Sequence, residues 1–257
     1  MSLRFCFLAS GSKGNCLYLE SDGRALLIDC GISRRQVFLR MEAAGLKPSS
    51  LEAIVLTHEH GDHVRGVRVL SQKLGGLPVL ATAATAAACR LDGPVAFETF
   101  EAGGRFQAAG MELTAFSLPH DAADPVGLVV ANHSARLGVA TDLGKPTALV
   151  KNRLAGCGAL VLECNHDPGL LANGPYPPWL KQRVASRHGH LSNQQGAELL
   201  AELHHQGLRR VVLAHLSETN NTPALAAAGA ADCLGRLDSR AALAVAGQYR
   251  PTEVMEI

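Results

Sequence analysis

The sequence predicts one α/β domain in which helices enclose two β-sheets. Short strand patterns occur in two groups along the 257 residues, and helical patterns follow each group. Since no linker, charge block, low-complexity tract or fixed-period repeat divides the groups, we expect residues 1–257 to form a single domain. Apolar residues make up 47% of the chain and charged residues 18%, a balance that supplies a core and excludes general disorder.

The first strand group lies upstream of residue 58, where Gly-rich turns separate short apolar or alternating segments. Between them, Ser33 is a candidate N-cap for a helix that stops at Gly45. A second helix is expected after His63 and should end at Gly75, followed by a strand at Val79 and an Ala-rich helix. The predicted strands of the first group are residues 3–9, 16–21, 25–30 and 53–57.

The second strand group begins at residue 97, where a period-two pattern returns and predicts a meander up to residue 140. Farther along, the Pro- and Gly-rich stretch 166–178 is the best candidate for a long functional loop. Ser192 should open a helix with Gln195 at its capping-box position, and Thr222 should cap a later one. The predicted strands are residues 97–101, 105–108, 111–117, 126–131, 137–140, 159–163, 211–214 and 241–246.

Charge and composition narrow the function classes. The 24 Lys and Arg residues balance 23 Asp and Glu residues, so the net charge of +1 gives no global basic field and any nucleic-acid site must be local. No apolar run approaches the ~18 residues that a membrane span needs, which predicts a soluble, cytoplasmic protein. The seven cysteines are odd in number and form no CxxC, which favours free buried thiols. The 11 histidines are the unusual feature and suggest metal ligands.

The densest group of candidate ligands is the hexad His58-Glu59-His60-Gly61-Asp62-His63, directly after the strand at residues 53–57. At this composition the pattern HxHxDH arises by chance in roughly one such chain in a thousand. A polar, solvated helix start is the alternative explanation. Residues 58 and 60 point the same way in an extended segment, whereas residues 62 and 63 turn with the following helix. The hexad can therefore serve two adjacent ions.

Three further candidate ligands follow strands elsewhere in the chain. His120 comes after the strand that ends at residue 117, Asp142 after the strand that ends at residue 140, and His215 directly after the strand 211–214. Taken singly, each could be structural, and Asp142 could simply cap a turn. Because all of them stand at strand exits, as the hexad does, we expect them to complete the metal sites.

These segments resemble the metallo-β-lactamase-fold hydrolases over nearly the whole chain. The hexad is specific to that superfamily, whereas the Asn-His-Asp and His-Leu-Ser segments are typical of its WalJ/YycJ branch. The resemblance implies a four-layer αββα sandwich of the α/β (α+β) class. It also implies one metal held by His58, His60 and His120 and another held by Asp62, His63 and His215, with Asp142 bridging both. The matching segments are residues 8–15, 58–63, 119–122, 141–144, 162–167, 189–193, 215–217 and 220–223.

Two divalent ions in such a cage suit phosphodiester hydrolysis. Dications ~3.5–4 Å apart lower the pKa of a shared water enough to supply a bridging hydroxide near neutrality, and they stabilise charge on the attacking and leaving oxygens. Asp62 could additionally orient the nucleophile. Imidazole and carboxylate ligands suit zinc or manganese, and iron is also compatible.

Departure of the leaving oxygen benefits from a proton donor. The tRNA-processing relatives in this superfamily use a Glu–His pair near the metals, and the resemblance places Glu163 and His190 at comparable positions. In that role His190 donates the proton and Glu163 orients it. The alternative is structural, with Glu163 bonded to backbone and His190 capping the helix that Ser192 opens.

A basic segment precedes His190 and is the candidate substrate-binding region. Lys181, Arg183 and Arg187 could face the metals and favour a polyanionic substrate, although an exposed helix flank is an equal alternative. The WalJ/YycJ resemblance implies a DNA exonuclease of 5′-to-3′ polarity. The competing prediction is a small-molecule hydrolase acting on a cyclic phosphodiester, thioester or lactone, because the same cage serves all of these. Neutral net charge and an aromatic content of 4% favour the competitor.

Overall fold

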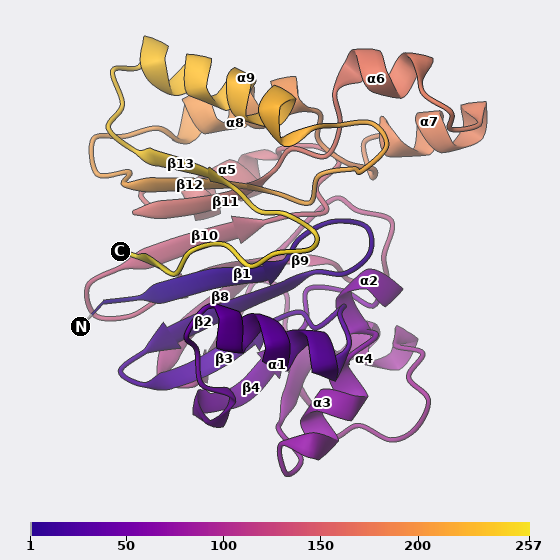
Figure 1. The fold of residues 1–257 in the computed structure, drawn as a ribbon, viewed down its shortest axis with the longest axis vertical. Coiled ribbons are helices and arrows are strands. Elements are labelled where there is room, and N and C mark those ends of the chain that lie inside the picture. Colours follow the sequence, from indigo (N-terminus) through magenta and orange to yellow (C-terminus); the bar gives the residue numbers. More distant parts are fainter. Residues whose placement is uncertain (1) are drawn as a thin grey trace.

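Two seven-stranded β-sheets pack face to face in the computed structural model, which describes residues 2–257 (Figure 1). In spatial order, the first sheet consists of β14 (Met255–Glu256), β1 (Arg4–Ala9), β2 (Cys16–Ser21), β3 (Arg24–Ile28), β4 (Leu51–Val55), β5 (Val79–Thr82) and β6 (Phe97–Phe100). The second sheet consists of β13 (Ala242–Val245), β12 (Arg210–Ala214), β11 (Ala159–Glu163), β10 (Arg136–Ala140), β9 (Val126–Ala131), β8 (Met111–Ser117) and β7 (Arg105–Ala108).

Each sheet has a parallel part and an antiparallel part. Neighbours from β3 to β6 are parallel in the first sheet, and neighbours from β10 to β13 are parallel in the second. Because β8 and β10 are both antiparallel to β9, these two strands also run in the same direction. The C-terminal ends of β8, β10, β11 and β12 therefore lie at one edge of the second sheet, where the loops that follow them can meet.

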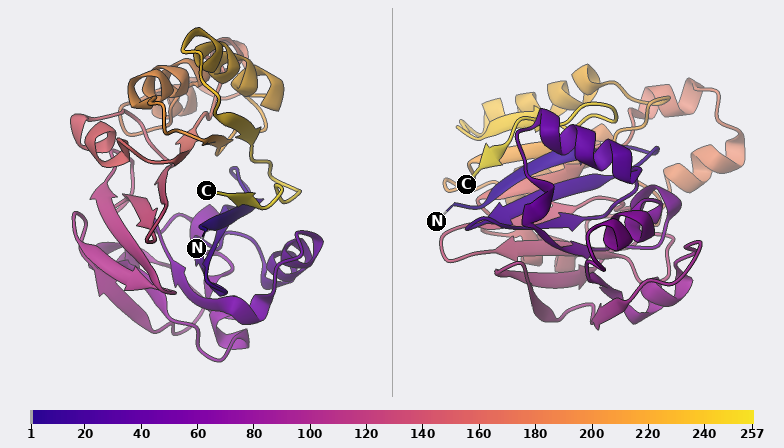
Figure 2. Two further views of the ribbon diagram at one scale, coloured as in Figure 1. Left: turned by 90° about the vertical axis from the view of Figure 1, so that its left-hand side faces the viewer. Right: turned by 60° about the horizontal axis from the view of Figure 1, so that its bottom comes forward.

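Helices cover the outer face of each sheet, which confirms the predicted four-layer αββα sandwich (Figures 1 and 2). Between the sheets, Phe5 and Leu26 of the first pack in one apolar cluster with Leu113 and Leu128 of the second. Burial of each such side chain contributes ~1.5–3 kcal/mol, so this layer holds the sheets together. The covering helices are α1 (Arg34–Ala43), α3 (Val67–Lys73) and α4 (Ala83–Ala88) on the first sheet, and α5 (Ala148–Leu154), α8 (Asn193–Leu203) and α9 (Pro223–Arg236) on the second.

The remaining helical segments lie in the connections. A 3₁₀ turn, Pro48–Ser50, precedes β4, and α2 (Gly61–Val64) begins inside the hexad. The helices α6 (Pro168–Asn173) and α7 (Pro178–Val184) extend beyond one end of the sandwich, at the right of Figure 1. That end is also where the loops after β4, β10 and β12 emerge.

Polar caps start the helices where the sequence predicts. Ser33, Ser192 and Thr222 each accept a hydrogen bond from a backbone N–H in the first turn of the helix that follows. Gln195 completes the capping box with Ser192, because its side chain accepts the Ser192 N–H in return. Such caps contribute ~0.5–2 kcal/mol each.

Two expectations need correction. The period-two region 97–140 is not one meander, because β6 pairs in parallel with β5 after the α4 crossover and belongs to the first sheet. The meander runs only from β7 to β10. The stretch 166–178, predicted as a loop, contains α6, whose N–H of Leu170 is capped by Asp167 and whose first residue is Pro168.

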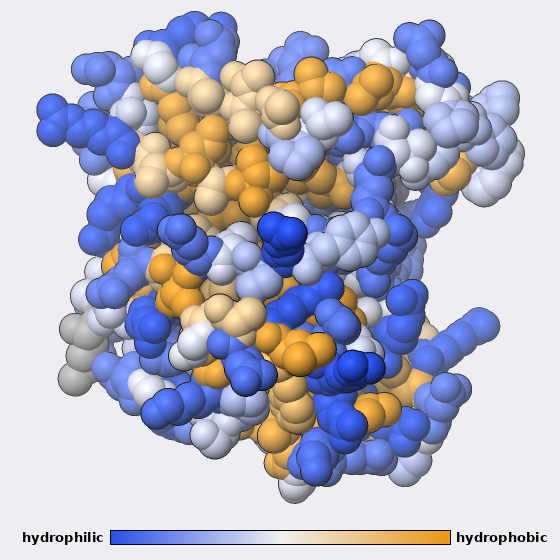
Figure 3. All heavy atoms as spheres, viewed as in Figure 1, coloured by the Kyte–Doolittle hydropathy of each residue, from blue (hydrophilic) through white to orange (hydrophobic). Residues whose placement is uncertain are grey.

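The described chain ends meet at the edge of the first sheet. β14 pairs with β1, and Leu3 and Ile257 exchange backbone hydrogen bonds, so the two ends lie side by side (Figure 2). The face drawn in Figure 3 is largely hydrophilic, and its hydrophobic side chains gather over α9 and β13. β13 is an edge strand. None of the helices within residues 2–257 has the length and apolar character to cross a membrane.

Candidate metal centre

The hexad joins β4 to α2 at the edge where the parallel strands end. Its side chains His58 and His63 are buried, while Asp62 is partly exposed. Asn15 N–H donates to the Asp62 carbonyl oxygen at 2.7 Å, which fixes the backbone of the hexad. A Cβ at Gly31 would overlap that same carbonyl oxygen at 1.6 Å. The glycine therefore allows the neighbouring loops to pack directly against the hexad.

The other predicted ligands follow strands of the second sheet and are buried. His120 lies shortly after β8, Asp142 shortly after β10, and His215 directly after β12. Asp142 has φ of 58° and His215 has φ of 57°, so the backbone enters the left-handed region at both positions. The chain thus turns sharply as it leaves each strand, and the side chains of Asp142 and His215 lie next to those of the hexad.

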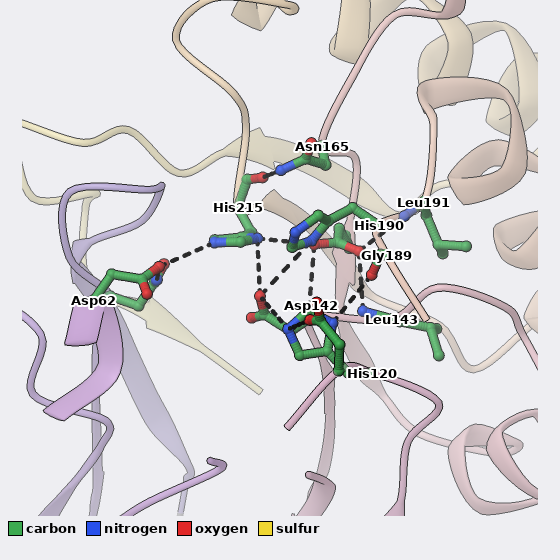
Figure 4. A network of polar contacts seen from close by, with 12 residues as sticks. Asp62, His120, Asp142, Leu143, Asn165, Gly189, His190, Leu191 and His215 are labelled. Carbon is green, nitrogen blue, oxygen red and sulfur yellow. Dashed lines mark hydrogen bonds and ion pairs between the residues drawn. The ribbon is translucent and has the colours of Figure 1, made fainter. Parts of the chain in front are cut away.

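The seven predicted ligands form two adjacent groups. The groups, each with ligand atoms within 4.8 Å of one another, are His58, His60 and His120, and Asp62, His63 and His215. Asp142 lies between them, with Oδ1 3.8 Å from His120 Nε2 and Oδ2 3.4 Å from His63 Nε2. Figure 4 shows this carboxylate among His120, His190 and His215. The structure therefore brings all the predicted ligands together.

Hydrogen bonds at Nδ1 orient the imidazole rings. A carbonyl or carboxylate oxygen only accepts, so a ring that contacts one there donates its Nδ1–H and keeps its Nε2 lone pair. The Nδ1 contacts are His63 with Asp29 Oδ2 (2.8 Å), His120 with Gly189 O (3.1 Å), His215 with Glu163 Oε1 (2.8 Å) and His58 with Thr57 Oγ1 (3.0 Å). Neutral rings held in this way offer Nε2 as a ligand atom.

Buried atoms without partners test whether a metal fits these residues. Within residues 2–257, the atoms His58 Nε2, His120 Nε2, His215 Nε2 and Asp142 Oδ2 are buried and have no hydrogen-bond partner. Each such group costs ~1–3 kcal/mol when left unsatisfied, so their gathering at one place is the arrangement that a bound cation would satisfy. Imidazole nitrogen and carboxylate oxygen are donors that divalent zinc, manganese and iron accept. The donor set fits a divalent-metal centre.

Burial and neighbouring charges set the protonation of the site. Burial lowers the pKa of His58 and of His120, which keeps both rings neutral as metal ligands must be. Burial opposes ionisation of Asp62, but the rings of His215 and His63, whose Nε2 atoms lie 3.5 Å from Asp62 Oδ2, hold its pKa well below the ordinary value. For His215, neighbouring carboxylates overcome burial and raise the pKa. Metal binding at His215 must therefore displace a proton.

Glu163 is fully buried at the end of β11 and joins several ligand-bearing loops. Burial opposes its ionisation, but His190 and His215 hold its pKa well below the ordinary value. His190 is 18% exposed at its side chain and lines the cavity over the metal residues. Ser192, and not His190, caps α8. The donors to Glu163 are the backbone N–H groups of Asp142, Leu143 and Leu191 and the Nδ1 atoms of His190 and His215.

A cavity of ≈ 210 Å³ opens over the ligands, and α7 forms part of its lining. Of the basic side chains predicted to bind substrate, Arg183 lines this cavity and its Nε donates to Asp121 Oδ2 at 2.6 Å. Lys181 Nζ donates instead to the carbonyl oxygen of Ala172 at 2.7 Å, which ties α7 to α6. Arg187 is exposed in the turn after α7.

Two buried residues beside the ligands are missing from the sequence prediction. Asp29 accepts hydrogen bonds from Thr57 Oγ1 at 2.9 Å and from His63 Nδ1 at 2.8 Å, and so orients the hexad. Asn15 accepts the Gly11 N–H through Oδ1, which leaves Nδ2 facing Asp62 Oδ2 at 3.3 Å. Asp29 has no sequence signal beyond a polar residue beside a buried strand, whereas Asn15 also ends the segment 8–15 that carries the family resemblance.

The four-layer sandwich and its His/Asp cluster at one edge define a metallo-β-lactamase-fold hydrolase. Residues 24–216 match the family model described as a β-lactamase superfamily domain, and the chain belongs to this superfamily. Among solved structures, the metallo-β-lactamase-fold protein YhfI from Bacillus subtilis superposes with a TM-score of 0.76 at 15% identity and covers 100% of both chains. Zn²⁺-bound PqqB from Methylobacterium extorquens gives 0.68 at 21% identity, covering 97% of this chain and 99% of its own.

Within the superfamily, the chain lies in the YycJ/WalJ branch. It is 36% identical over 230 residues to the exodeoxyribonuclease YycJ of Bacillus anthracis, covering 88% of this chain and 87% of the relative. It is 33% identical over 237 residues to the exodeoxyribonuclease WalJ of Streptococcus pneumoniae, covering 88% and 86%. The similarity spans the segments that carry the ligands, so the recognition made from the sequence motifs is confirmed.

Proposed function

We propose that this protein is a dinuclear metal-dependent phosphodiesterase that degrades DNA as an exonuclease of 5′-to-3′ polarity. The observation that carries the dinuclear part is the position of Asp142, whose two oxygens face the two histidine groups. The exonuclease part is supported by relatives that bear the name exodeoxyribonuclease and match most of this chain. The polarity is supported only by the branch resemblance.

In this proposal, the chain holds two divalent ions, zinc or manganese by donor type, with iron also compatible. Two bound ions would supply a hydroxide nucleophile near neutral pH and would offset charge on the phosphate oxygens. Asp142 would bridge the ions, and the partly exposed Asp62 would orient the nucleophile. The ligand sets would be His58, His60 and His120 for one ion and Asp62, His63 and His215 for the other.

His190 is the proposed proton donor. Its Nδ1–H donates to Glu163 Oε1 at 2.9 Å, and the imidazolium form, protonated on both nitrogens, would pass its Nε2 proton to a leaving oxygen in the cavity. Glu163 holds the ring in that orientation and is a positioning residue. Arg183, which lines the same cavity, would contact a phosphate, and Lys181 and Arg187 would add positive charge around it.

The first test is hydrolysis by zinc- and manganese-loaded protein. Single-stranded DNA labelled at its 5′ end should release a labelled mononucleotide at once, whereas the same strand labelled at its 3′ end should shorten gradually. The opposite pattern contradicts the proposed polarity. RNA, bis-p-nitrophenyl phosphate, a thioester and a lactone are assayed in parallel. The alternative is a small-molecule hydrolase, and turnover of a thioester or lactone without DNA cleavage would establish it.

The second test separates chemistry from metal binding. His190→Ala should retain its metals and lose about 10²–10⁴-fold in activity on DNA, the usual effect of losing a general acid. The loss should be much smaller on bis-p-nitrophenyl phosphate, because p-nitrophenolate leaves without a proton. Equal losses on both substrates, or loss of metal, would contradict the assigned role.

A further inference from the structure

The segment between β11 and α8 leaves the sandwich and returns over the metal residues. It contains α6 and α7, which extend past the end of the two sheets at the right of Figure 1. On its return it places Tyr176, Leu180 and Val184 in the lining of the cavity. These three side chains, called here the α7 wall, share that cavity with His190 and with five of the seven candidate ligands, namely His60, Asp62, His120, Asp142 and His215.

The α7 wall is fastened to the loops that carry the ligands. Arg183 Nε donates to Asp121 Oδ2 at 2.6 Å, next to His120 in sequence. His190 N–H donates to the Val184 carbonyl oxygen at 2.8 Å. Lys181 Nζ holds α6 through a carbonyl oxygen at 2.7 Å. With these ties, α7 is positioned relative to the metal residues and is not a free arm.

The aromatic member of the wall is held by local sequence. Tyr176 stands in the run Gly174-Pro175-Tyr176-Pro177-Pro178, and a residue before proline is confined to extended backbone. A Cβ at Gly174 would lie 2.5 Å from Asn220 Oδ1, so this glycine packs against the loop that follows His215. The backbone that carries the ring therefore has little conformational freedom left to lose on binding.

The cavity therefore has two chemically different sides. The metal residues offer a place for a phosphate, whereas Tyr176, Leu180 and Val184 contribute one aromatic and two aliphatic side chains to the same lining. A nucleobase joins a phosphate to a flat aromatic face, and stacking accepts any base. The cavity, ≈ 210 Å³ in volume, opens to solvent, so the terminal base of a strand can enter it from outside.

We propose that the α7 wall is a subsite for the face of one terminal nucleobase beside the scissile phosphate. This inference rests on the proposed nuclease function for its biological meaning. The aromatic content of 4% does not oppose it, because one well-placed ring suffices for one base. Base identity should matter little, since the wall offers stacking and no pattern of hydrogen bonds along the base edge.

The test compares a nucleotide with its baseless counterpart. Calorimetry on metal-loaded protein measures the affinity for dAMP and for deoxyribose 5-phosphate. We expect dAMP to bind more tightly, and Tyr176→Ala to weaken dAMP by about 5- to 150-fold, the range for one lost stacking contact. The same substitution should change the affinity for deoxyribose 5-phosphate less than twofold. Tyr176→Phe should keep most of the dAMP affinity, because the ring remains.

The matched control is Trp179→Ala, three residues farther along the chain in α7. Trp179 is the sole tryptophan of the sequence, is 66% exposed and is not among the described residues that line the cavity. It should leave dAMP binding unchanged. Equal losses from Trp179→Ala and Tyr176→Ala, or equal losses for dAMP and deoxyribose 5-phosphate, would overturn the base subsite.

Cleavage assays separate this inference from the proposed function. A strand whose first three nucleotides are abasic should be cut by the parent and by Tyr176→Ala at similar rates, whereas the normal strand should be cut more slowly by the variant. If the parent cuts DNA and Tyr176→Ala cuts the normal strand equally well, the subsite is wrong and the nuclease stands. If the parent binds dAMP in a Tyr176-dependent way and cuts no DNA, the subsite stands and the nuclease is wrong.

Discussion

Replacing Glu163 by glutamine tests how far both the fold and the metal centre depend on one buried carboxylate. The side chain is 0% exposed. Its Oε2 accepts two backbone N–H groups, from Leu143 at 3.0 Å and Leu191 at 2.9 Å. Its Oε1 accepts the Nδ1–H of His215 at 2.8 Å and of His190 at 2.9 Å, together with one further backbone N–H. Glutamine keeps the shape but has a single acceptor oxygen.

Each orientation of the new amide has a definite consequence. With its oxygen toward the histidines, its NH₂ faces the Leu143 and Leu191 N–H groups, and two buried unsatisfied donors cost about 2–6 kcal/mol at ~1–3 kcal/mol each. With its NH₂ toward the histidines, both rings must accept at Nδ1 and carry their proton on Nε2. His215 then loses the lone pair that faces the metal. A domain is stable by only about 5–15 kcal/mol, so either outcome is measurable.

Two measurements on Glu163→Gln therefore complement each other. Urea unfolding of chelator-treated protein, followed by far-ultraviolet circular dichroism, reports the first outcome. Competitive titration with a zinc indicator reports the second, where loss of a group that orients a ligand typically lowers affinity 10–100-fold. Glu198→Gln, an exposed carboxylate on α8, is the control and should change neither. A variant with parental metal affinity and a stability within about 1 kcal/mol of the parent would refute the reasoning.

Three further outcomes follow from the same geometry. Asp142→Ala should lower the affinity for both ions and His215→Ala chiefly for one, because only Asp142 faces both histidine groups. Elemental analysis across a metal titration distinguishes the two variants. A saturated parent protein that holds at most one ion would contradict the dinuclear proposal. Arg183→Ala should reduce the magnitude of the salt slope of single-strand binding by about 0.7, the effect of one lost phosphate contact. Arg187→Ala should change that slope less, because Arg187 is exposed and lies outside the cavity lining. If the parent and both variants have equal slopes, Arg183 does not contact a phosphate. In the native protein a thiol reagent should modify at most Cys89, and slowly, because burial raises the pKa of that thiol to about 11. After unfolding, the reagent should modify all seven cysteines. Rapid modification of several thiols in the native protein would contradict the packing.

Local patterns predicted the elements well and their partners less well. The strands at residues 105–108, 111–117 and 126–131 coincide with β7, β8 and β9, because alternation reports a strand with one buried face directly. The same signal at residues 97–101 gave no information about which sheet receives the strand. The crossover through α4, a tertiary feature, decided that. β14 is too short to leave a pattern.

The gathering of the candidate ligands was predictable because each of their segments follows a strand, and parallel strands present their C-terminal ends at one edge. Asp29 and Asn15 were not, since a single polar residue beside a strand has no spacing that marks it. The α7 wall could not be predicted from the sequence either, because the sequence pattern indicated only a basic segment. The structure shows that Lys181 donates a hydrogen bond to α6 and that Arg183 donates one to Asp121. The basic residues thus hold in place the apolar side chains that face the cavity.

The left-handed backbone at Asp142 and His215 reverses an ordinary rule of substitution. In most structured positions alanine leaves a protein more stable than glycine, because glycine has more freedom to lose on folding. A residue with a Cβ in the left-handed region instead bears a steric penalty of about 1–2 kcal/mol that glycine avoids. In the metal-free protein, glycine at either position should therefore unfold at higher denaturant concentration than alanine, although both remove the ligand. Selection for stability alone would draw these two positions toward glycine, and a lineage that lost the metal chemistry should show that drift there first.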